Sequence, residues 1–138
     1  MEIDSREPFK IKVHALKTGD ISFECPLGKV IMERKTPEDF LASLQDKDPN
    51  GANRLERELL ALKEKADIPI LLIEGKFTLA NIRGFKMLAI RNMLFAIKLN
   101  GIIVEFCDDA IKRATELYSY LNKKKHYFLR KGVLTKKE

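Results

Sequence analysis

Three adjacent charged residues carry the strongest chemical signal in this chain. Glu33, Arg34 and Lys35 follow the short apolar run 30–32, and Pro37 comes two residues later. A short apolar run bounded in this way is typical of a β-strand. Because strand side chains alternate between faces, Glu33 and Lys35 should point one way and Arg34 the other. A carboxylate beside an ammonium suits a metal ion and a charged transition state better than it suits a core.

The residues after this strand predict the start of a helix. Thr36 can cap it and Pro37 suits its first position, while two acidic residues, Glu38 and Asp39, suit its first turn. We expect this helix to span residues 37–45. The charged residues 33–35 would then lie at the end of a strand, directly before a helix.

Acidic residues also lie at the expected ends of two other strands. Together with Glu33, Asp4 and Asp20 could supply the carboxylate oxygens that Mg²⁺ prefers. Such an ion activates water and neutralises charge on a phosphate, and Lys35 could orient that water. Each piece is weak alone, because Glu-x-Lys is also an ordinary strand-end ion pair and Gly-Asp is usually only a turn.

Composition indicates one globular domain with a basic end. The 138 residues are 45% apolar and 33% charged, which excludes a disordered chain. Residues 1–109 hold 17 Lys+Arg against 18 Asp+Glu, whereas residues 110–138 hold 9 against 2. The basic end suggests a polyanionic partner such as nucleic acid, or else a solvated tail. Two cysteines without metal-type spacing suggest a reduced intracellular protein, and no apolar run is long enough to span a bilayer.

Hydrophobic patterning predicts an α/β fold with a central mixed β-sheet flanked by helices on both faces. The expected strands cover residues 1–4, 10–16, 21–25, 30–35, 68–73 and 102–107, and the expected helices cover 37–45, 52–66, 85–99 and about 109–121. The first strands follow one another closely, which favours an antiparallel meander. The fully apolar run 68–73 is expected to be central and buried on both faces.

Two of the expected helices raise the question of what covers them. The helix over 85–99 is apolar nearly all round, so it is buried either by the fold or by a partner. The last helix carries an apolar stripe that includes Tyr118 and Leu121, and we expect this stripe to add to the same interface. In the helix over 52–66 we expect the apolar side chains to face the core, namely Leu55, Leu59, Leu60 and Leu62.

These charged residues form a recognisable motif. Gly19-Asp20, followed by Glu33-Arg34-Lys35 and then Asp39, resembles the GD…ERK-x-x-x-D motif of XPF-type structure-specific endonucleases, which include the archaeal Hef nuclease and the Mus-type nucleases. Further matches run through most of the chain: residues 3–7 resemble the opening D-x-R-E strand, residues 53–55 the G-R-L helix start, and residues 71–75 the apolar strand that ends in Glu.

The resemblance implies a restriction-endonuclease-like fold and Mg²⁺-dependent hydrolysis of DNA phosphodiester bonds near flaps, forks or junctions, in DNA repair or recombination. Mn²⁺ would be able to replace Mg²⁺. Carried over by position, Asp20 and Glu33 would be metal ligands, Asp4 a further acidic site member, Lys35 the catalytic lysine, and Arg34 a DNA or site-ordering contact. The expected DNA-binding residues are Arg6, Arg34, Arg54, Lys123, Lys124 and Lys125, and Glu7, Asp39 and Glu74 match motif positions of less definite role.

The chain also departs from the family pattern. We expect the helix that usually follows the D-x-R-E strand to be lost, because only Pro8 and Phe9 separate that strand from the next, and Glu58 stands near where Gln is common. We therefore expect one XPF-type nuclease domain over 1–138, with a basic tail at about 123–138 and without a helix-hairpin-helix module or a helicase. Its partners would be branched or flapped DNA and a second nuclease subunit, as a homodimer or heterodimer, without a membrane.

Two other functions stay open at this point. One is a nuclease of the same broad fold that resolves Holliday junctions. The other is a non-catalytic DNA-binding subunit of a nuclease heterodimer, although such partners lose the acidic and lysine residues that stand here at Asp20, Glu33 and Lys35. In each case the protein is expected to be intracellular, in the cytoplasm of a prokaryote or the nucleus of a eukaryote.

Overall fold

The computed structural model describes residues 12–13 and 20–123 of the chain, and for Lys12, Val13 and Asp20 it describes the backbone alone. Several sequence-based expectations therefore lie outside the described residues. They are the strand over 1–4, most of the strand over 10–16, the loss of the helix that usually follows the D-x-R-E strand, the site residues Asp4, Arg6 and Glu7, and the tail from Lys124 onward, Lys125 included.

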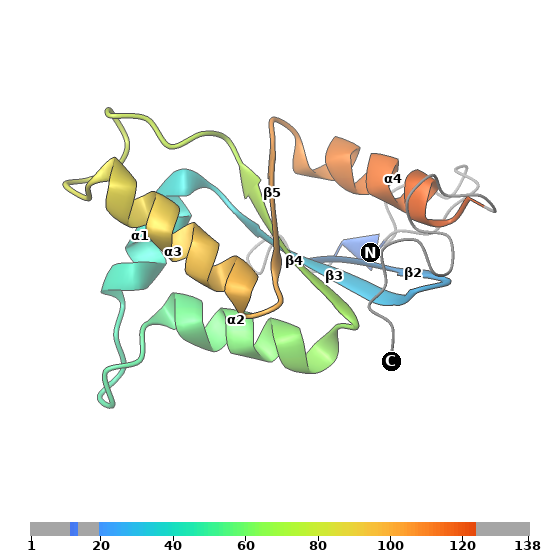
Figure 1. The fold of residues 1–138 in the computed structure, drawn as a ribbon, viewed down its shortest axis with the longest axis horizontal. Coiled ribbons are helices and arrows are strands. Elements are labelled where there is room, and N and C mark those ends of the chain that lie inside the picture. Colours follow the sequence, from blue (N-terminus) through green and yellow to red (C-terminus); the bar gives the residue numbers. More distant parts are fainter. Residues whose placement is uncertain (1–11, 14–19, 124–138) are drawn as a thin grey trace.

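Within the described residues a mixed sheet of five strands lies at the centre, and its mixed pairing confirms the predicted fold class (Figure 1). The strands lie in chain order: β1 (Lys12–Val13), β2 (Asp20–Cys25), β3 (Gly28–Lys35), β4 (Ile68–Glu74) and β5 (Ile103–Cys107). The first three pair antiparallel and the last three pair parallel. Tight turns suit antiparallel pairs, whereas a parallel pair needs a helical crossover between its two strands, and helices do lie between β3 and β4 and between β4 and β5.

Four helices cover the two faces of this sheet unequally. They are α1 (Pro37–Gln45), α2 (Arg54–Lys65), α3 (Met87–Leu99) and α4 (Ala110–Leu121). The first three pack on one face, and α4 packs on the other (Figure 1). Period-two alternation along the strands explains the division, because Ile31 faces α1–α3 while its neighbours Val30 and Met32 face α4.

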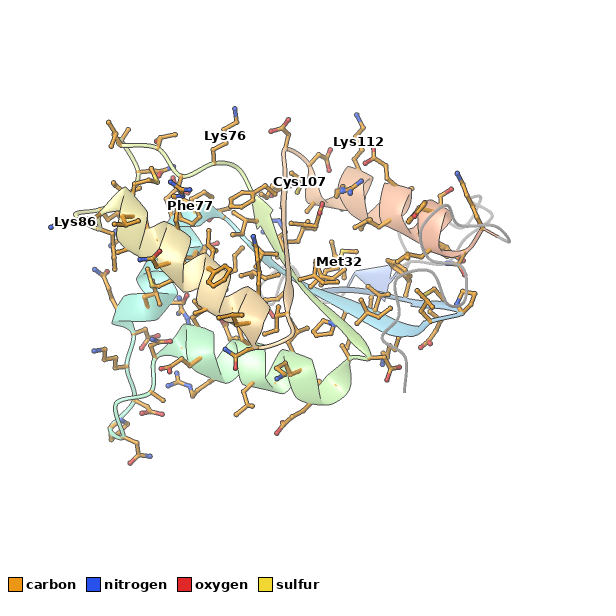
Figure 2. All side chains as sticks on the ribbon, viewed as in Figure 1. Met32, Lys76, Phe77, Lys86, Cys107 and Lys112 are labelled. Atoms are coloured by element: carbon orange, nitrogen blue, oxygen red, sulfur yellow. The ribbon has the colours of Figure 1, made fainter. Side chains whose placement is uncertain are left out.

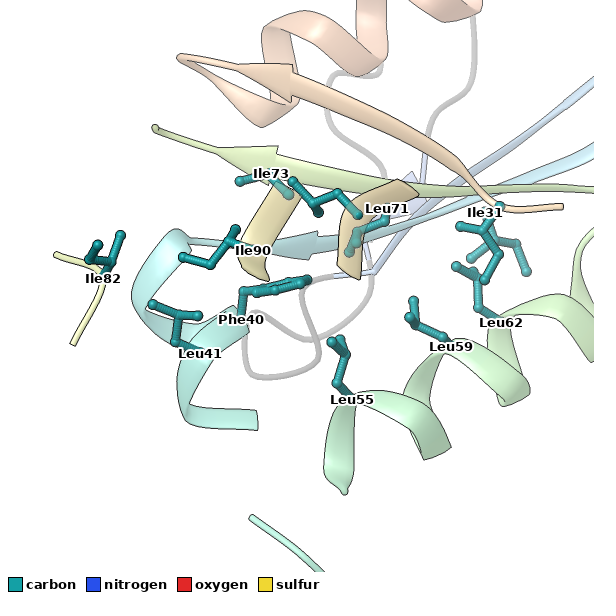
Figure 3. Packing of buried hydrophobic residues seen from close by; sticks show 12 residues of the cluster. Ile31, Phe40, Leu41, Leu55, Leu59, Leu62, Leu71, Ile73, Ile82 and Ile90 are labelled. Atoms are coloured by element: carbon teal, nitrogen blue, oxygen red, sulfur yellow. The ribbon is translucent and has the colours of Figure 1, made fainter. Parts of the chain in front are cut away.

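The core under α1, α2 and α3 shows why these segments are helical (Figure 3). Leu55, Leu59 and Leu62 recur at helical spacing and lie on one buried stripe of α2. Leu60 is 60% exposed, so the expectation that it faces the core is wrong. One helical step of about 100° separates it from Leu59 and turns it away from the sheet.

Gly75, directly after β4, lies close to the end of β5 and to the start of α1. Gly75 has a φ of 121°, and its N–H donates to the carbonyl of Cys107 at 2.8 Å. A Cβ on this glycine would lie 3.1 Å from Cδ of Pro37. The end of β4 therefore abuts the first turn of α1, which begins two residues after Lys35.

The parallel strands β4 and β5 differ in how deeply they are buried. Residues 70–73 of β4 are buried, as expected for a central strand. By contrast, β5 pairs with β4 alone among the described strands and is an edge strand. Its side chains Ile103 and Phe106 are each 48% exposed.

The two apolar helices also behave differently. In α3 the buried residues are Ile90 and Leu94, so the fold covers only one side of this helix. In α4, Leu121 is buried and the ring of Tyr118 lies 5.1 Å from that of Phe23. The expectation that the α4 stripe faces a partner is wrong for these positions, because they pack on the sheet.

Candidate functional site

The end of β3 brings two charged side chains together inside the fold. Glu33 is 8% exposed and Lys35 is 6% exposed. Both lie on the sheet face that α1, α2 and α3 cover, as strand alternation predicts. The register of β2 and β3 sets Asp20 directly opposite Glu33. The antiparallel hairpin thus joins the two motif acids, which lie thirteen positions apart in the sequence.

A third acidic residue, Glu58, reaches this site from α2. Its Oε1 atom lies 2.7 Å from Nζ of Lys35, and the two side chains are 31% and 8% exposed. Glu58 Oε1 is shielded from solvent and receives no hydrogen bond of good geometry within the described residues, so the contact is ionic. Sequence reasoning notes Glu58 only as a departure from a family pattern. The missed signal is its spacing of three residues from Leu55, which places a carboxylate beside the buried stripe of α2.

Arg34 lies on the opposite face of the sheet. Its Nε–H donates to Oε1 of Glu74 at 2.8 Å, and its Nη2 lies 2.6 Å from the same oxygen. The other oxygen of Glu74 accepts the backbone N–H of Ala110 at 2.7 Å. One carboxylate therefore ties the end of β3, the end of β4 and the N-terminus of α4 together. A carboxylate is well placed there, because a helix N-terminus carries partial positive charge.

Two further motif residues lie at helix starts. Thr36 caps α1, and its hydroxyl accepts the N–H of Asp39 at 3.1 Å. The side chain of Asp39 is exposed in the first turn of α1. Arg54 is the first residue of α2 and forms an ion pair with Asp46 at 3.2 Å. It stands one helical turn before Glu58, on the same helix.

Charge also gathers at the ends of β4 and β5. Burial, the carboxylate of Glu74 and then that of Asp109 raise the pKa of the Cys107 thiol from its ordinary 9.0 to about 11. Glu105 on β5 forms an ion pair with Arg113 of α4 at 2.9 Å. Lys123 is exposed just after the end of α4. These groups lie away from Glu33 and Lys35 along the chain.

The donor set at the β3 end suits a hard cation in number and chemistry. Mg²⁺ in proteins is held by one or two carboxylates, with water and substrate phosphate oxygens completing its shell. Glu33 supplies one carboxylate, and Asp20 is opposite it in register. Among the side chains that the structure describes, no cluster of three or more His, Cys, Asp or Glu could hold a metal. A protein-only cage is thus not found in that part, while a two-carboxylate site is compatible with the register.

No helix within the described residues is long and apolar enough to cross a membrane. Comparison with protein families matches the ERCC4 domain to residues 3–120. No curated protein and no solved structure matches this chain.

Proposed function

Because this chain belongs to the ERCC4-domain family of nucleases, with its restriction-endonuclease-like fold, we propose that it is a metal-dependent endonuclease for branched or flapped DNA. One observation carries the proposal. A buried carboxylate and a buried ammonium, Glu33 and Lys35, share one face at a strand end, and Asp20 stands opposite in the pairing register. Burying two opposite charges costs desolvation free energy, so a buried pair is favoured where it has a function. A plain DNA-binding surface does not need buried charges.

Each residue then has a defined task. Glu33 and Asp20 would hold Mg²⁺, with Mn²⁺ as a substitute, and Asp4 would be a further acidic member of the site. When bound, the divalent ion supplies Lewis-acid stabilisation of charge on the scissile phosphate. Lys35 would orient the attacking water or stabilise the non-bridging oxygens through its ammonium. Its low exposure favours this task, because a positive charge acts more strongly where water is excluded.

The other motif residues take supporting roles in this proposal. Arg34 is held by Glu74 on the far face, so we assign it to ordering the strand end rather than to DNA contact. The side chain of Asp39 is exposed in the first turn of α1. Only its match to the motif makes it a candidate site residue. The proposed DNA contacts are Arg6, Arg54, Lys123, Lys124 and Lys125.

The direct test replaces each site residue and measures cleavage. Glu33→Ala and Lys35→Ala should each lower the single-turnover rate by about 10²–10⁴-fold, the range expected for the loss of a general acid–base or electrostatic group. Matched controls come from the same hairpin, since Glu24 and Lys29 are exposed. Glu24→Ala and Lys29→Ala should keep the parental rate. Full activity in a well-folded Glu33→Ala or Lys35→Ala variant would contradict the assignment of that residue to the active site.

Substrate class needs a panel of labelled DNAs. Duplex, 3′-flap, 5′-flap, fork and four-way junction substrates would each be incubated with Mg²⁺, with Mn²⁺ and with chelator. We expect cleavage near the branch with either ion and none with chelator. Preference for the four-way junction would favour a Holliday-junction resolvase. Binding without cleavage of any substrate would favour a non-catalytic subunit. For such a nuclease we propose an intracellular location, in the cytoplasm of a prokaryote or the nucleus of a eukaryote.

We also propose that this nuclease acts as a dimer through α3 and β5. The apolar side chains Leu88, Phe95 and Leu99 of α3 are 65%, 61% and 73% exposed. They continue onto the exposed residues of the edge strand β5. A hollow of about 680 Å³ is lined by residues of α3 and β5, Leu88, Phe95 and Phe106 among them. Phe77, whose side chain is labelled in Figure 2, also lines it. Contiguous apolar surface of this kind is typical of an interface. The partner would be a second copy or a related nuclease subunit.

Light scattering at micromolar concentration tests this assembly. We expect a mass near two chains that falls on dilution. Phe95→Glu should give a mass near one chain, because it places a charge in the interface. Leu27→Glu is the matched control, since Leu27 is 49% exposed in the β2–β3 turn. A mass near one chain at every concentration would exclude the homodimer and leave a heterodimer to be sought by co-expression.

A further inference from the structure

Glu58 is a polar residue at a position that packing alone would make apolar. It lies on α2 between Leu55 and Leu62, and both of these are buried against the sheet. Its carboxylate reaches Lys35 Nζ at 2.7 Å, and Lys35 is 8% exposed through its side chain. Lys35 therefore has its ammonium end held under α2 rather than free in solvent.

The ion pair of Lys35 with Glu58 is expected to add little to the free energy of unfolding. Taking two charges out of water costs about as much as their attraction returns, so an apolar pair of similar volume would often be neutral or better. Glu58 Oε1 is also shielded from solvent without a hydrogen bond of good geometry from the described residues. An arrangement that does not improve folding but fixes one atom of a site side chain indicates a positioning role.

We propose that Glu58 is a positioning residue that sets the location of the Lys35 ammonium beside Glu33. The catalytic part of this inference rests on the proposed nuclease function, whereas the structural part does not. A lysine has four rotatable bonds, and its head group explores a wide volume unless something holds it. A carboxylate on the rigid helix α2 removes that freedom before substrate arrives. The general benefit is preorganisation, since a misplacement of about 1 Å can cost roughly 10²-fold in rate.

The family pattern sharpens the inference. The sequence carries Glu58 near where the resemblance leads one to expect Gln, so an amide is replaced by a carboxylate. Both side chains offer an oxygen acceptor of the same reach, but only the carboxylate adds charge. Because the contact with Lys35 is ionic, positioning by charge predicts that Glu58→Gln loses most of the function that Glu58→Ala loses.

Lysine labelling tests the structural part without any need for nuclease activity. Folded protein would be treated with a limiting amount of acetic anhydride, and the modification of each lysine would be read by mass spectrometry. Lys35 should react slowly in the parent and roughly tenfold faster or more in Glu58→Ala, because the ion pair that holds its ammonium under α2 is lost. Lys29 and Lys63 are exposed and should not change. Equal Lys35 reactivity in parent and folded Glu58→Ala would overturn the proposal.

Kinetics test the catalytic part. Glu58→Ala should lower kcat by about 10- to 100-fold while KM for DNA stays within a factor of about three, because Glu58 acts through Lys35. Glu58→Gln should show most of the same loss, because it keeps the volume without the charge, and in a Lys35→Ala background the Glu58→Ala change should have no further effect. Glu64→Ala is the control, since Glu64 is exposed on the same helix.

The outcomes separate the two proposals. If the parent protein cleaves no DNA, the proposed function fails and the labelling result alone decides the position of Lys35. If the parent cleaves and Glu58→Ala cleaves equally well, the positioning role fails while the nuclease stands. Glu58→Gln has nearly the same volume as Glu58, so it keeps the test usable if Glu58→Ala does not fold.

Discussion

The carboxylate of Glu74 should be worth more to stability than any surface ion pair of this protein. It accepts Arg34 through two nitrogens, at 2.8 and 2.6 Å, and it accepts the N–H of Ala110 at 2.7 Å. Glu74→Ala removes these contacts together. It leaves Arg34 without its carboxylate partner and removes the acceptor at the start of α4.

The size of the effect can be worked from those contacts. The Arg34 side chain is 36% exposed, so solvent screens its pair with Glu74, and we credit that pair with about 1 kcal/mol. The contact with the N-terminus of α4 resembles an N-cap interaction and is worth about 1 kcal/mol. Glu74→Ala should therefore lower the free energy of unfolding by about 2 kcal/mol. Glu74→Gln keeps an oxygen acceptor but loses the charge, so we expect a loss of about 1 kcal/mol.

Urea unfolding followed by circular dichroism would measure both variants. The midpoint should fall while the slope m stays constant, because the folded and unfolded states expose the same surface as before. Glu116→Gln is the control, since Glu116 pairs with Arg113 at 3.2 Å but is 50% exposed. It should change stability by less than about 0.5 kcal/mol. The reasoning is refuted if Glu74→Ala is as stable as that control.

Two more predictions concern the end of β5 and the basic tail. With its pKa raised to about 11, Cys107 should be alkylated by iodoacetamide with a half-maximal rate near that pH, and a midpoint near 9.0 would contradict this. Since the folded value lies above the unfolded one, the protein should lose stability between pH 9 and 11, and Cys107→Ser should lose less, as read from Tm against pH. Deleting residues 123–138 should flatten the slope of log DNA affinity against log salt, because up to seven Lys and Arg side chains no longer release counterions. An unchanged slope would leave that segment as a solvated tail.

Local patterns predict the local structure of this chain well. The helix expected over 37–45 is found with those bounds, because cap, proline and acidic first turn all act within a few residues. The alternation that puts Lys35 and Arg34 on opposite faces is confirmed by their different ion-pair partners. Such features depend on short-range sterics and electrostatics, which the sequence displays directly.

Contacts that join distant segments are harder to foresee. The pair of Lys35 with Glu58 depends on how α2 crosses the sheet, and the contact of Glu74 with Ala110 spans 36 positions. Neither has a spacing that a local pattern could reveal. The outward turn of Leu60 and the inward turn of Tyr118 have the same origin, because the choice of face is made by the neighbouring elements and not by the helix alone.

The close approach of Gly75 to Pro37 has a consequence for how this chain tolerates changes in length. A side chain at position 75 would press on the proline ring 3.1 Å away and shift the turn that follows Lys35. Phe77 is anchored as well, with its ring 5.5 Å from that of Phe40. Beyond it the chain runs outward, and Leu79 is 85% exposed. A scan of inserted residues should therefore find a sharp border: insertions before Phe77 disturb the whole strand end, whereas insertions around Leu79 lengthen a surface loop whose length can vary freely while the site stays in place.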